Sequence, residues 1–432
     1  MKKRVFLVLL MVIGLILSMH SPGLAKEIKV LAQFPMSGPV GSLPEFGWGF
    51  IDGMNWINGE GGGVNGKKIK WYLEDFRYNP TVEVANFNKH AAKHSRDEFL
   101  MATGYITGGL KPLINKINVE EKIPWLDGSY STEIFGPDGG PSKYPYYYSL
   151  GATYGDQIKM LMKWIKEDYK GSGKPKVGLV YSPTSWGRDG IPEGKAYAAK
   201  LGLDIVSEIE YPYSATTATN ECMTLRKAKV QYVIIHGYSG AGSYTAIFFK
   251  TAKKILKDVQ LMGTHYTTGR TSILYSQEAF DGYVGVACRP FLDAIPRSKT
   301  PMDNPLVKMA HDFAKKYRSE AYNKPGFGPG RINDMFLYME GLTYALIIQK
   351  ALTEADNAGE LTRLGVKKAL DKMVWDFMGM FDGKTFSYKS HTIPMLRMFR
   401  AHVKMVTVGG KTVPTGAVVP IADWVNTDEV EW

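Results

Sequence analysis

The stretch from Ile28 to Asp75 has the pattern of a strand, a helix and a second strand, which limits the chain to folds with a parallel sheet. The apolar run Ile28–Phe34 is stopped by Pro35 and predicts a buried strand. From Phe46 to Asn58 apolar residues recur at helical spacing, and the glycines that follow end the helix, because glycine accepts a left-handed conformation. Lys67–Asp75 predicts the second strand. The loop after the first strand therefore lies at the carboxyl edge of the sheet, where open α/β sheets bind small molecules.

Four motifs in this region carry a family resemblance. They are the Ser-Gly-Pro turn at residues 37–39, the helix-to-strand junction INGEGGGVNGKKI, the acidic strand end LEDF and the segment YNPTVEVANFNKH. Together they resemble periplasmic solute-binding proteins of the branched-chain amino acid type, the receptors of ABC importers. The resemblance extends from Glu27 to about the last hundred residues and thins after about Pro290. It implies a small-molecule ligand and an inner-membrane ABC permease as partners, and no catalytic activity.

Alternating strands and helices run through two successive halves of the chain, which predicts an α/β protein with two doubly wound lobes. Its 432 residues and 44% hydrophobic content are enough for two such cores. The resemblance implies that both lobes are discontinuous and joined by a three-strand hinge. We expect the first lobe to comprise residues 26–149 and 284–380, and the second to comprise residues 150–283 and 381–432. We expect a monomer.

Residues 1–25 have the pattern of a secretory signal peptide. Lys2, Lys3 and Arg4 precede an apolar run of thirteen residues, which is short for a membrane span. Gly23-Leu24-Ala25 then predicts cleavage after Ala25, and we expect a periplasmic protein. The formal charge of +11 includes these three cations, and the other Lys and Arg residues are scattered. This distribution indicates a solvated basic surface rather than a nucleic-acid interface.

The loops after the predicted strands supply groups for a ligand site between the two lobes. Hydroxyl groups come from the side chains of Thr107, Ser129 and Ser131. Rings are available from six aromatic residues, which are Phe46, Trp48, Tyr105, Tyr130, Trp186 and Tyr238. A cleft with rings for walls and a few hydroxyl groups is typical of small-molecule sites.

The family resemblance assigns roles to some of these positions. It implies that the ligand carboxylate is held by Gly108 and by Ser129, Tyr130 and Ser131, and that Trp186 and Tyr238 are aromatic contacts. The family's acidic partner for a ligand ammonium aligns at about His265, and there is no Asp or Glu between Val259 and Gln277. Burying an ammonium without a carboxylate is costly. We therefore expect a small carboxylate or polar molecule with an apolar or aromatic body, rather than a simple amino acid. Arg331 is a further candidate anion partner.

Other motifs suggest competing functions. Gly237-Tyr238-Ser239-Gly240-Ala241 approximates a nucleophile elbow, so a secreted α/β serine hydrolase that uses Ser239, Asp281 and His391 or His402 is the alternative. Gly61–Gly66 satisfies G-x-G-x-x-G but follows a helix, which is the reverse of a nucleotide-binding loop. His90 and His94 have metal-ligand spacing on a helix without a third ligand nearby. We expect no cofactor and no metal, and leave a disulfide between Cys222 and Cys288 open.

Overall fold

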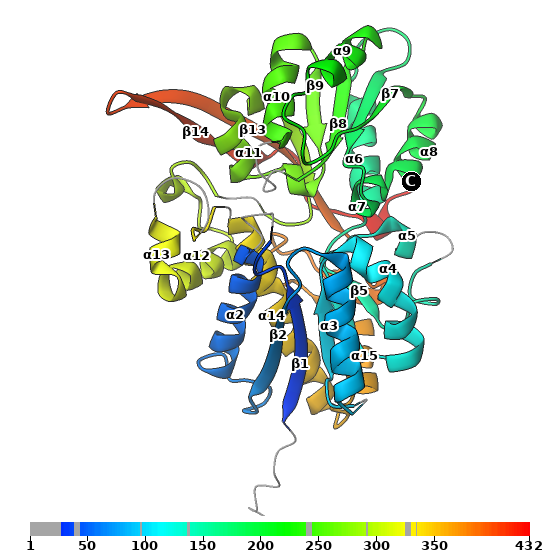
Figure 1. Ribbon diagram of the computed structural model, residues 1–432, viewed down its shortest axis with the longest axis vertical. Coiled ribbons are helices and arrows are strands. Elements are labelled where there is room, and N and C mark those ends of the chain that lie inside the picture. Colours follow the sequence, from blue (N-terminus) through cyan, green and yellow to red (C-terminus); the bar gives the residue numbers. More distant parts are fainter. Residues whose placement is uncertain are drawn as a thin grey trace, which may run out of the picture.

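The computed structural model describes residues 27–38, 44–95, 97–135, 139–238, 244–290, 293–324, 330–333 and 335–432 (Figure 1). The predicted signal peptide, residues 1–25, lies outside this part of the chain. Two lobes stand one above the other, each with its own sheet, and this confirms the predicted two-lobed α/β fold (Figure 1). The predicted strand and helix at the start of the chain are observed as β1 (Ile28–Phe34) and α2 (Pro44–Asn58).

The first lobe is built on a five-stranded parallel sheet in the order β2-β1-β3-β4-β5. Apolar side chains on β1 alternate between two cores, with Val30 and Ala32 in one and Leu31 in the other. Because both faces of the sheet are covered, the strand is apolar throughout. The remaining elements are β2 (Ile69–Asp75), α3 (Pro80–Lys93), β3 (Met101–Gly104), α4 (Thr107–Asn115), the π-helix η1 (Lys116–Glu121), β4 (Trp125–Asp127), α5 (Thr132–Phe135) and β5 (Tyr147–Ser149).

The later part of the chain adds four helices to the first lobe: α12 (Pro305–Tyr317), α13 (Ser319–Asn323), α14 (Met335–Asn357) and α15 (Arg363–Asp371). Helix α14 packs closely against α2, because glycines stand at the crossing. A Cβ atom at Gly341 would lie 1.9 Å from the carbonyl oxygen of Phe46, and one at Gly49 would lie 1.8 Å from that of Tyr338. From α14 the Tyr344 hydroxyl donates, at 2.6 Å, to the carbonyl of Gly104 at the carboxyl end of β3.

The second lobe contains an eight-stranded sheet whose main path is β14-β13-β10-β9-β8-β6-β7, with β15 paired to β13. The five neighbouring strands β7, β6, β8, β9 and β10 are parallel to one another. Strands β13 and β14 add an antiparallel hairpin that projects to one side (Figure 1). The strands are β6 (Lys176–Tyr181), β7 (Asp204–Glu210), β8 (Tyr232–His236), β9 (Gln260–Gly263), β10 (Val284–Ala287), β13 (Met395–Val408), β14 (Lys411–Pro420) and β15 (Val425–Asn426).

Helices of the second lobe alternate with its parallel strands. They are α6 (Tyr154–Asp168), α7 (Ser185–Arg188), α8 (Ile191–Leu201), α9 (Thr219–Lys227), α10 (Tyr244–Ile255), the 3-10 turn η2 (His265–Thr267) and α11 (Arg270–Ser276). A separate two-stranded sheet pairs β11 (Val374–Trp375) with β12 (Phe386–Ser387). The alternation of strand and helix in both lobes is the doubly wound arrangement that the sequence predicted.

Three passages of chain lie side by side between the lobes. The N–H of Ser149 donates to the carbonyl of His391 at 2.8 Å, and the guanidinium of Arg289 donates to the carbonyl of Leu150 at 2.9 Å. These bonds bring together the chain after β5, after β10 and before β13, as a three-strand hinge requires. The residue numbers at which each lobe begins and ends stay a prediction.

Candidate functional site

A small cavity of about 20 Å³, room for a water molecule, lies between the lobes. Four of the eight residues that line the cavity come from each lobe. Most of these residues follow the carboxyl end of a strand, where α/β sheets hold their ligands. The first lobe supplies Tyr78, Tyr105, Ile106 and Thr107, and the second supplies Tyr154, Trp186, Tyr238 and Tyr266. The structure therefore brings together four of the predicted site residues: Tyr105, Thr107, Trp186 and Tyr238.

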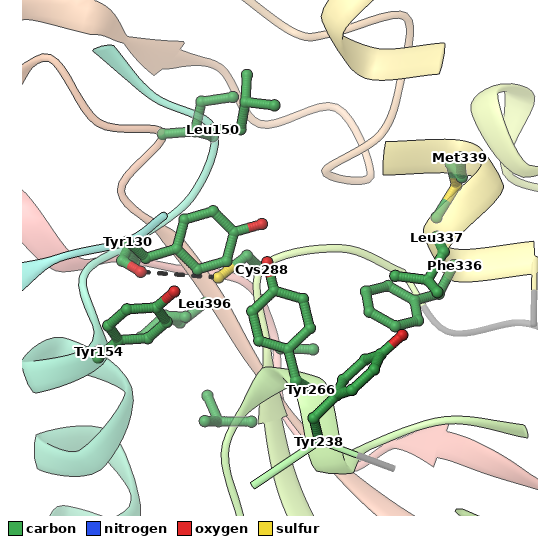
Figure 2. Close-up of a cluster of buried hydrophobic side chains, with 14 of the residues drawn as sticks. Tyr130, Leu150, Tyr154, Tyr238, Tyr266, Cys288, Phe336, Leu337, Met339 and Leu396 are labelled. Carbon is green, nitrogen blue, oxygen red and sulfur yellow. Dashed lines mark hydrogen bonds between the residues drawn. The ribbon is translucent and has the colours of Figure 1, made fainter. Parts of the chain in front are cut away.

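Tyr266 lies at the centre of the aromatic side chains that surround this cavity. Its ring is 5.8 Å from Tyr238, 6.1 Å from Trp186 and 6.3 Å, across the lobe boundary, from Tyr105. Figure 2 shows the Tyr266 ring between the rings of Tyr130 and Phe336, both at centroid distances of 5.8 Å. The Tyr266 hydroxyl donates to the carbonyl of Gly128 in the first lobe at 3.0 Å. One side chain thus forms part of the cavity wall and also links the two lobes.

Trp186 is positioned by a buried histidine. His236, at the end of β8, lies with its ring 4.7 Å from the Trp186 ring, and its Nε2 is 3.2 Å from the Trp186 carbonyl oxygen. Burial lowers the pKa of His236 to about 4, so that this imidazole is neutral at pH 7. The Trp186 indole N–H is buried, and no hydrogen-bond partner for it occurs among the described residues. A buried donor without a partner costs free energy, so this N–H has capacity for an acceptor.

The predicted hydroxyl donors are engaged with other groups of the protein. The Oγ1 of Thr107 lies 2.7 Å from the Oγ of Ser129, and the Ser129 N–H donates to the Asp127 carboxylate at 2.6 Å. The Ser131 hydroxyl donates to the carboxylate of Asp189 in the second lobe. Ser131 therefore forms an interlobe contact, although the family resemblance assigned it to the ligand.

Buried carboxylates accept the N–H groups of these loops. Asp189 accepts from the Thr132 N–H at 2.8 Å, and Glu83 accepts from the Tyr105 N–H at 3.0 Å. Burial raises the pKa of Asp189 to about 6 and that of Asp127 to about 7. Burial, together with the nearby Asp127, also raises the pKa of Glu83 well above its usual value. Three amides of the loops that were expected to bind an anion, those of Tyr105, Ser129 and Thr132, are thus paired with carboxyl groups of the same chain.

Behind the cavity, charged and polar groups from both lobes meet around Glu340 of α14. The Tyr130 hydroxyl donates to Glu340, and an Arg289 guanidinium nitrogen lies 3.7 Å from its Oε1. His265 Nε2 is 4.0 Å from Glu340 Oε2, and burial lowers the pKa of His265. The sequence argument considered only the residues near His265 and found no acid there. In three dimensions α14 brings the Glu340 carboxylate to this position, where it is paired with Arg289, so the absence of a free acid partner for a ligand ammonium stays a prediction.

The other predicted site residues lie away from the cavity lining. Phe46 is fully buried in the first core, with its ring 4.5 Å from Tyr105. Trp48 lies 5.6 Å from the guanidinium of Arg318. Gly108, in the first turn of α4, faces Pro80 of α3. Arg331 is half-buried just before α14, and its carbonyl accepts from the Asn333 side chain. Whether any of these residues binds a ligand stays a prediction.

Besides the lining residues Tyr78 and Ile106, five residues of this region were not singled out by the sequence analysis. Glu340 had the clearest signal, because it is the only charged residue in the otherwise apolar stretch from Met335 to Ile348. A lone acid in such a stretch indicates a buried and specifically paired carboxylate. Tyr266 is adjacent to the predicted His265. No comparable sequence signal marks the remaining three, Tyr154, Asp189 and Arg289.

The groups of the serine-hydrolase alternative are engaged in other contacts. Ser239 lies outside the described residues. Asp281 accepts from the N–H of Val403 at 2.9 Å, and His391 Nε2 lies 3.0 Å from Asp371 Oδ1. His402 pairs with Ala417 in the β13–β14 hairpin. The structure gives this alternative no support.

Two further candidate sites were considered from the sequence. His90 lies 2.6 Å from Glu74, and His94 lies 2.8 Å from Glu98. Within the described residues, no group of three or more His, Cys, Asp or Glu side chains could hold a metal ion.

Both cysteines are buried and free. No helix among the described residues is both long enough and apolar enough to cross a membrane.

Comparisons with known proteins agree on one family. A family model described as periplasmic binding protein matches residues 27–410. A branched-chain amino acid ABC transporter structure from Thermus thermophilus, with bound valine, has a TM-score of 0.75 at 20% identity and covers 93% of this chain and 96% of its own. A solute-binding protein from R. palustris in complex with 4-hydroxybenzoate has a TM-score of 0.67 at 18% identity, and the match covers 94% of this chain and 100% of that protein's chain. No curated protein sequence matches the chain.

Proposed function

Because the chain belongs to the periplasmic binding protein family, we propose that it is the extracytoplasmic receptor of an ABC importer. It captures a small molecule between its lobes and presents the closed form to an inner-membrane permease. Closure requires contacts that only the closed form makes. The bond from the Tyr266 hydroxyl to Gly128 and the bond from Ser131 to Asp189 join the two lobes, and we expect both to break when the lobes separate.

The observation that carries this proposal is the cavity between the lobes, to which each lobe contributes four lining residues. A molecule held there touches both lobes and so stabilises the closed form. The rings favour a ligand with an apolar or aromatic body, and the Trp186 N–H favours one with a polar acceptor atom. Structures similar to this chain hold valine, 4-hydroxybenzoate and 3,4-dihydroxybenzoic acid.

Residues 1–25 direct export in this proposal, and the mature protein begins at Lys26 and acts as a monomer in the periplasm. Intact-mass measurement of protein from the periplasmic fraction tests cleavage after Ala25. A mature chain that begins elsewhere, or protein retained in the cytoplasm, contradicts this part of the proposal.

Native mass spectrometry tests the receptor function. Protein purified without denaturation is expected to carry one small molecule, and protein stripped by unfolding and refolding is expected to lose it and to melt at a lower temperature. Adding the released molecule back restores the melting temperature. The matched variants are Tyr266→Ala, which should lose the molecule, and Trp375→Leu, which alters a ring on β11 outside the cavity and should retain it. Equal retention by both variants contradicts a site between the lobes.

A further inference from the structure

The long hairpin of strands β13 and β14 projects from the second lobe, and its far end, residues 404–415, is called the hairpin tip below (Figure 1). The pairing of the two strands is continuous up to Val408, which lies opposite Lys411. The turn is made by Gly409 and Gly410, whose φ angles of 56° and 77° are the left-handed values that a two-residue turn of type I′ requires. The register of the tip is therefore fixed, and with it the set of side chains that share a face.

One face of the hairpin tip is apolar and exposed to solvent. Val406 lies directly opposite Val413, and Val408 is the next β13 residue on the same face, because side chains alternate along a strand. The exposed fractions of Val406, Val413 and Val408 are 37%, 40% and 64%. Neighbouring apolar side chains that stay exposed mark a contact surface more often than single ones do.

The hairpin is also uniformly basic. Residues 395–420 include four Lys or Arg residues and no Asp or Glu. The two cations of the tip, Lys404 and Lys411, are exposed, and neither has an ion pair within the part of the chain that the structure describes. Both lie on the apolar face, since Lys404 is two positions before Val406 and Lys411 is opposite Val408. A surface that is anionic and partly apolar complements both properties of the tip.

A lipid surface fits the hairpin tip better than a protein strand or a second copy of this chain does. Strand addition at the outer edge of β14 is obstructed, because Gly416 already exchanges hydrogen bonds with Ile295 at 2.8 and 3.1 Å and Pro414 has no N–H. Two tips packed on each other would bring the same cations together, which is unfavourable. A fluid anionic bilayer needs no matching groove, and it accepts cations beside apolar side chains.

We propose that the hairpin tip docks on a phospholipid bilayer with anionic head groups. Lys404 and Lys411 lie among the phosphates of the head groups, and Val406, Val408 and Val413 enter the interface. This inference goes beyond the receptor function proposed above and does not depend on the bound molecule, because no residue of the hairpin lines the interlobe cavity.

Co-sedimentation of the purified protein with vesicles tests the role of charge. The protein should bind phosphatidylcholine vesicles that contain about one-third phosphatidylglycerol, bind phosphatidylcholine alone much more weakly, and lose affinity in high salt. Each lysine near an anionic surface contributes about fivefold in affinity, so Lys404→Gln with Lys411→Gln should lose about 30-fold. Lys170→Gln with Lys174→Gln removes two exposed lysines from the loop before β6 and should lose little. Equal binding to both kinds of vesicle, binding to neither, or equal losses in the two double variants overturns the proposal.

A fluorescent label tests whether the apolar face reaches the bilayer. Cys222 and Cys288 are both buried, so an environment-sensitive dye reacts with the cysteine introduced by Val408→Cys. Emission from this dye should shift to the blue on vesicles that contain phosphatidylglycerol. The same dye at Val119→Cys, a site on η1 that is 58% exposed, should show no shift. No shift at position 408, or equal shifts at both positions, overturns the proposal.

Further arms of the experiment cover the role of the valines and the other occupants. Val406→Thr with Val408→Thr keeps the branched shape that suits a strand and removes apolar surface. This variant should bind the anionic vesicles at least about threefold more weakly at an unchanged melting temperature, and unchanged binding overturns the role of the valines. A dye shift in concentrated protein without vesicles assigns the tip to a contact between copies, and an equal shift with soluble polyglutamate assigns it to an acidic polypeptide; either result overturns the proposal.

Docking and the receptor function can fail independently. The hairpin variants should retain the natively bound molecule, because the tip does not line the cavity. A protein that carries this molecule and ignores vesicles refutes only docking. A protein that binds anionic vesicles through the tip and carries no molecule refutes only the receptor function.

Discussion

Substituting Glu340 by glutamine should destabilise the protein far more than the loss of one surface charge would. Glu340 and Arg289 are both fully buried, with 3.7 Å between the guanidinium and the carboxylate. Glutamine retains an oxygen that can accept from the Tyr130 hydroxyl, so the substitution removes mainly the charge. Leaving a buried guanidinium without its anion costs about 3–5 kcal/mol. The free energy of unfolding of Glu340→Gln should fall by this amount.

The matched control lies on the same helix. Glu354 pairs with Lys350 at 2.9 Å, but both side chains are exposed. Exposed pairs contribute about 0–1 kcal/mol, so Glu354→Gln should be nearly neutral. Urea unfolding followed by fluorescence and circular dichroism gives both free energies by linear extrapolation.

A double-mutant cycle decides whether the two buried charges are coupled. Arg289→Met alone should cost about as much as Glu340→Gln, because it leaves the carboxylate uncompensated. The double variant removes both charges and should lose clearly less than the sum of the two single variants. Additive losses, or a loss below about 1 kcal/mol in Glu340→Gln, would refute the reasoning that this pair is a desolvated and mutually dependent unit.

Two other predictions concern the helix crossing and the interlobe carboxylate. Gly341→Ala places a methyl group 1.9 Å from the Phe46 carbonyl oxygen and should lower the free energy of unfolding by about 1–3 kcal/mol; unchanged stability would show that α2 and α14 do not approach this closely. Burial raises the pKa of Asp189 from 3.8 to about 6, so the folded protein holds a proton between about pH 4 and pH 6 that the unfolded chain has released. The contribution of Asp189 to stability therefore falls as pH rises through this window, and Asp189→Asn should gain about 3 kcal/mol relative to the natural protein between pH 4 and pH 7. Equal differences in the free energy of unfolding at the two pH values would contradict this assignment.

Most secondary-structure elements of the fold were predictable, because they depend on local patterns. The apolar run that ends at Pro35 is β1, and the Asn79-Pro80 start signal opens α3, with the Asn79 side chain accepting from the Thr81 N–H at 2.9 Å. From the sequence alone we predict one helix over residues 110–121, but the structure begins α4 at Thr107 and continues from Lys116 as the π-helix η1. The sequence likewise predicts one helix over residues 305–322, but the structure divides it at Arg318, whose φ of −133° is not helical. Local pattern identifies the type of an element more reliably than its ends.

The site was only partly predictable, since it depends on which side chains meet across the lobe boundary. Tyr105, Trp186 and Tyr238 were found because each follows a predicted strand, and such positions converge in any α/β sheet. Ser131 follows the same rule, yet its hydroxyl is taken by Asp189. No local pattern predicts that pairing, because Asp189 belongs to the other lobe.

The sequence by itself determined the class of fold, the presence of two lobes and the edge at which a ligand could bind, because hydrophobic periodicity and turn residues act over a few neighbouring positions. The tertiary structure alone decided which groups meet at that edge. Glu83 and Asp189, from distant elements, accept the Tyr105 and Thr132 amides, and α14 brings Glu340 to within 4.0 Å of His265 although 75 positions separate them in the chain. Electrostatic interactions depend on distance in space and on burial, and neither quantity is written in the order of residues.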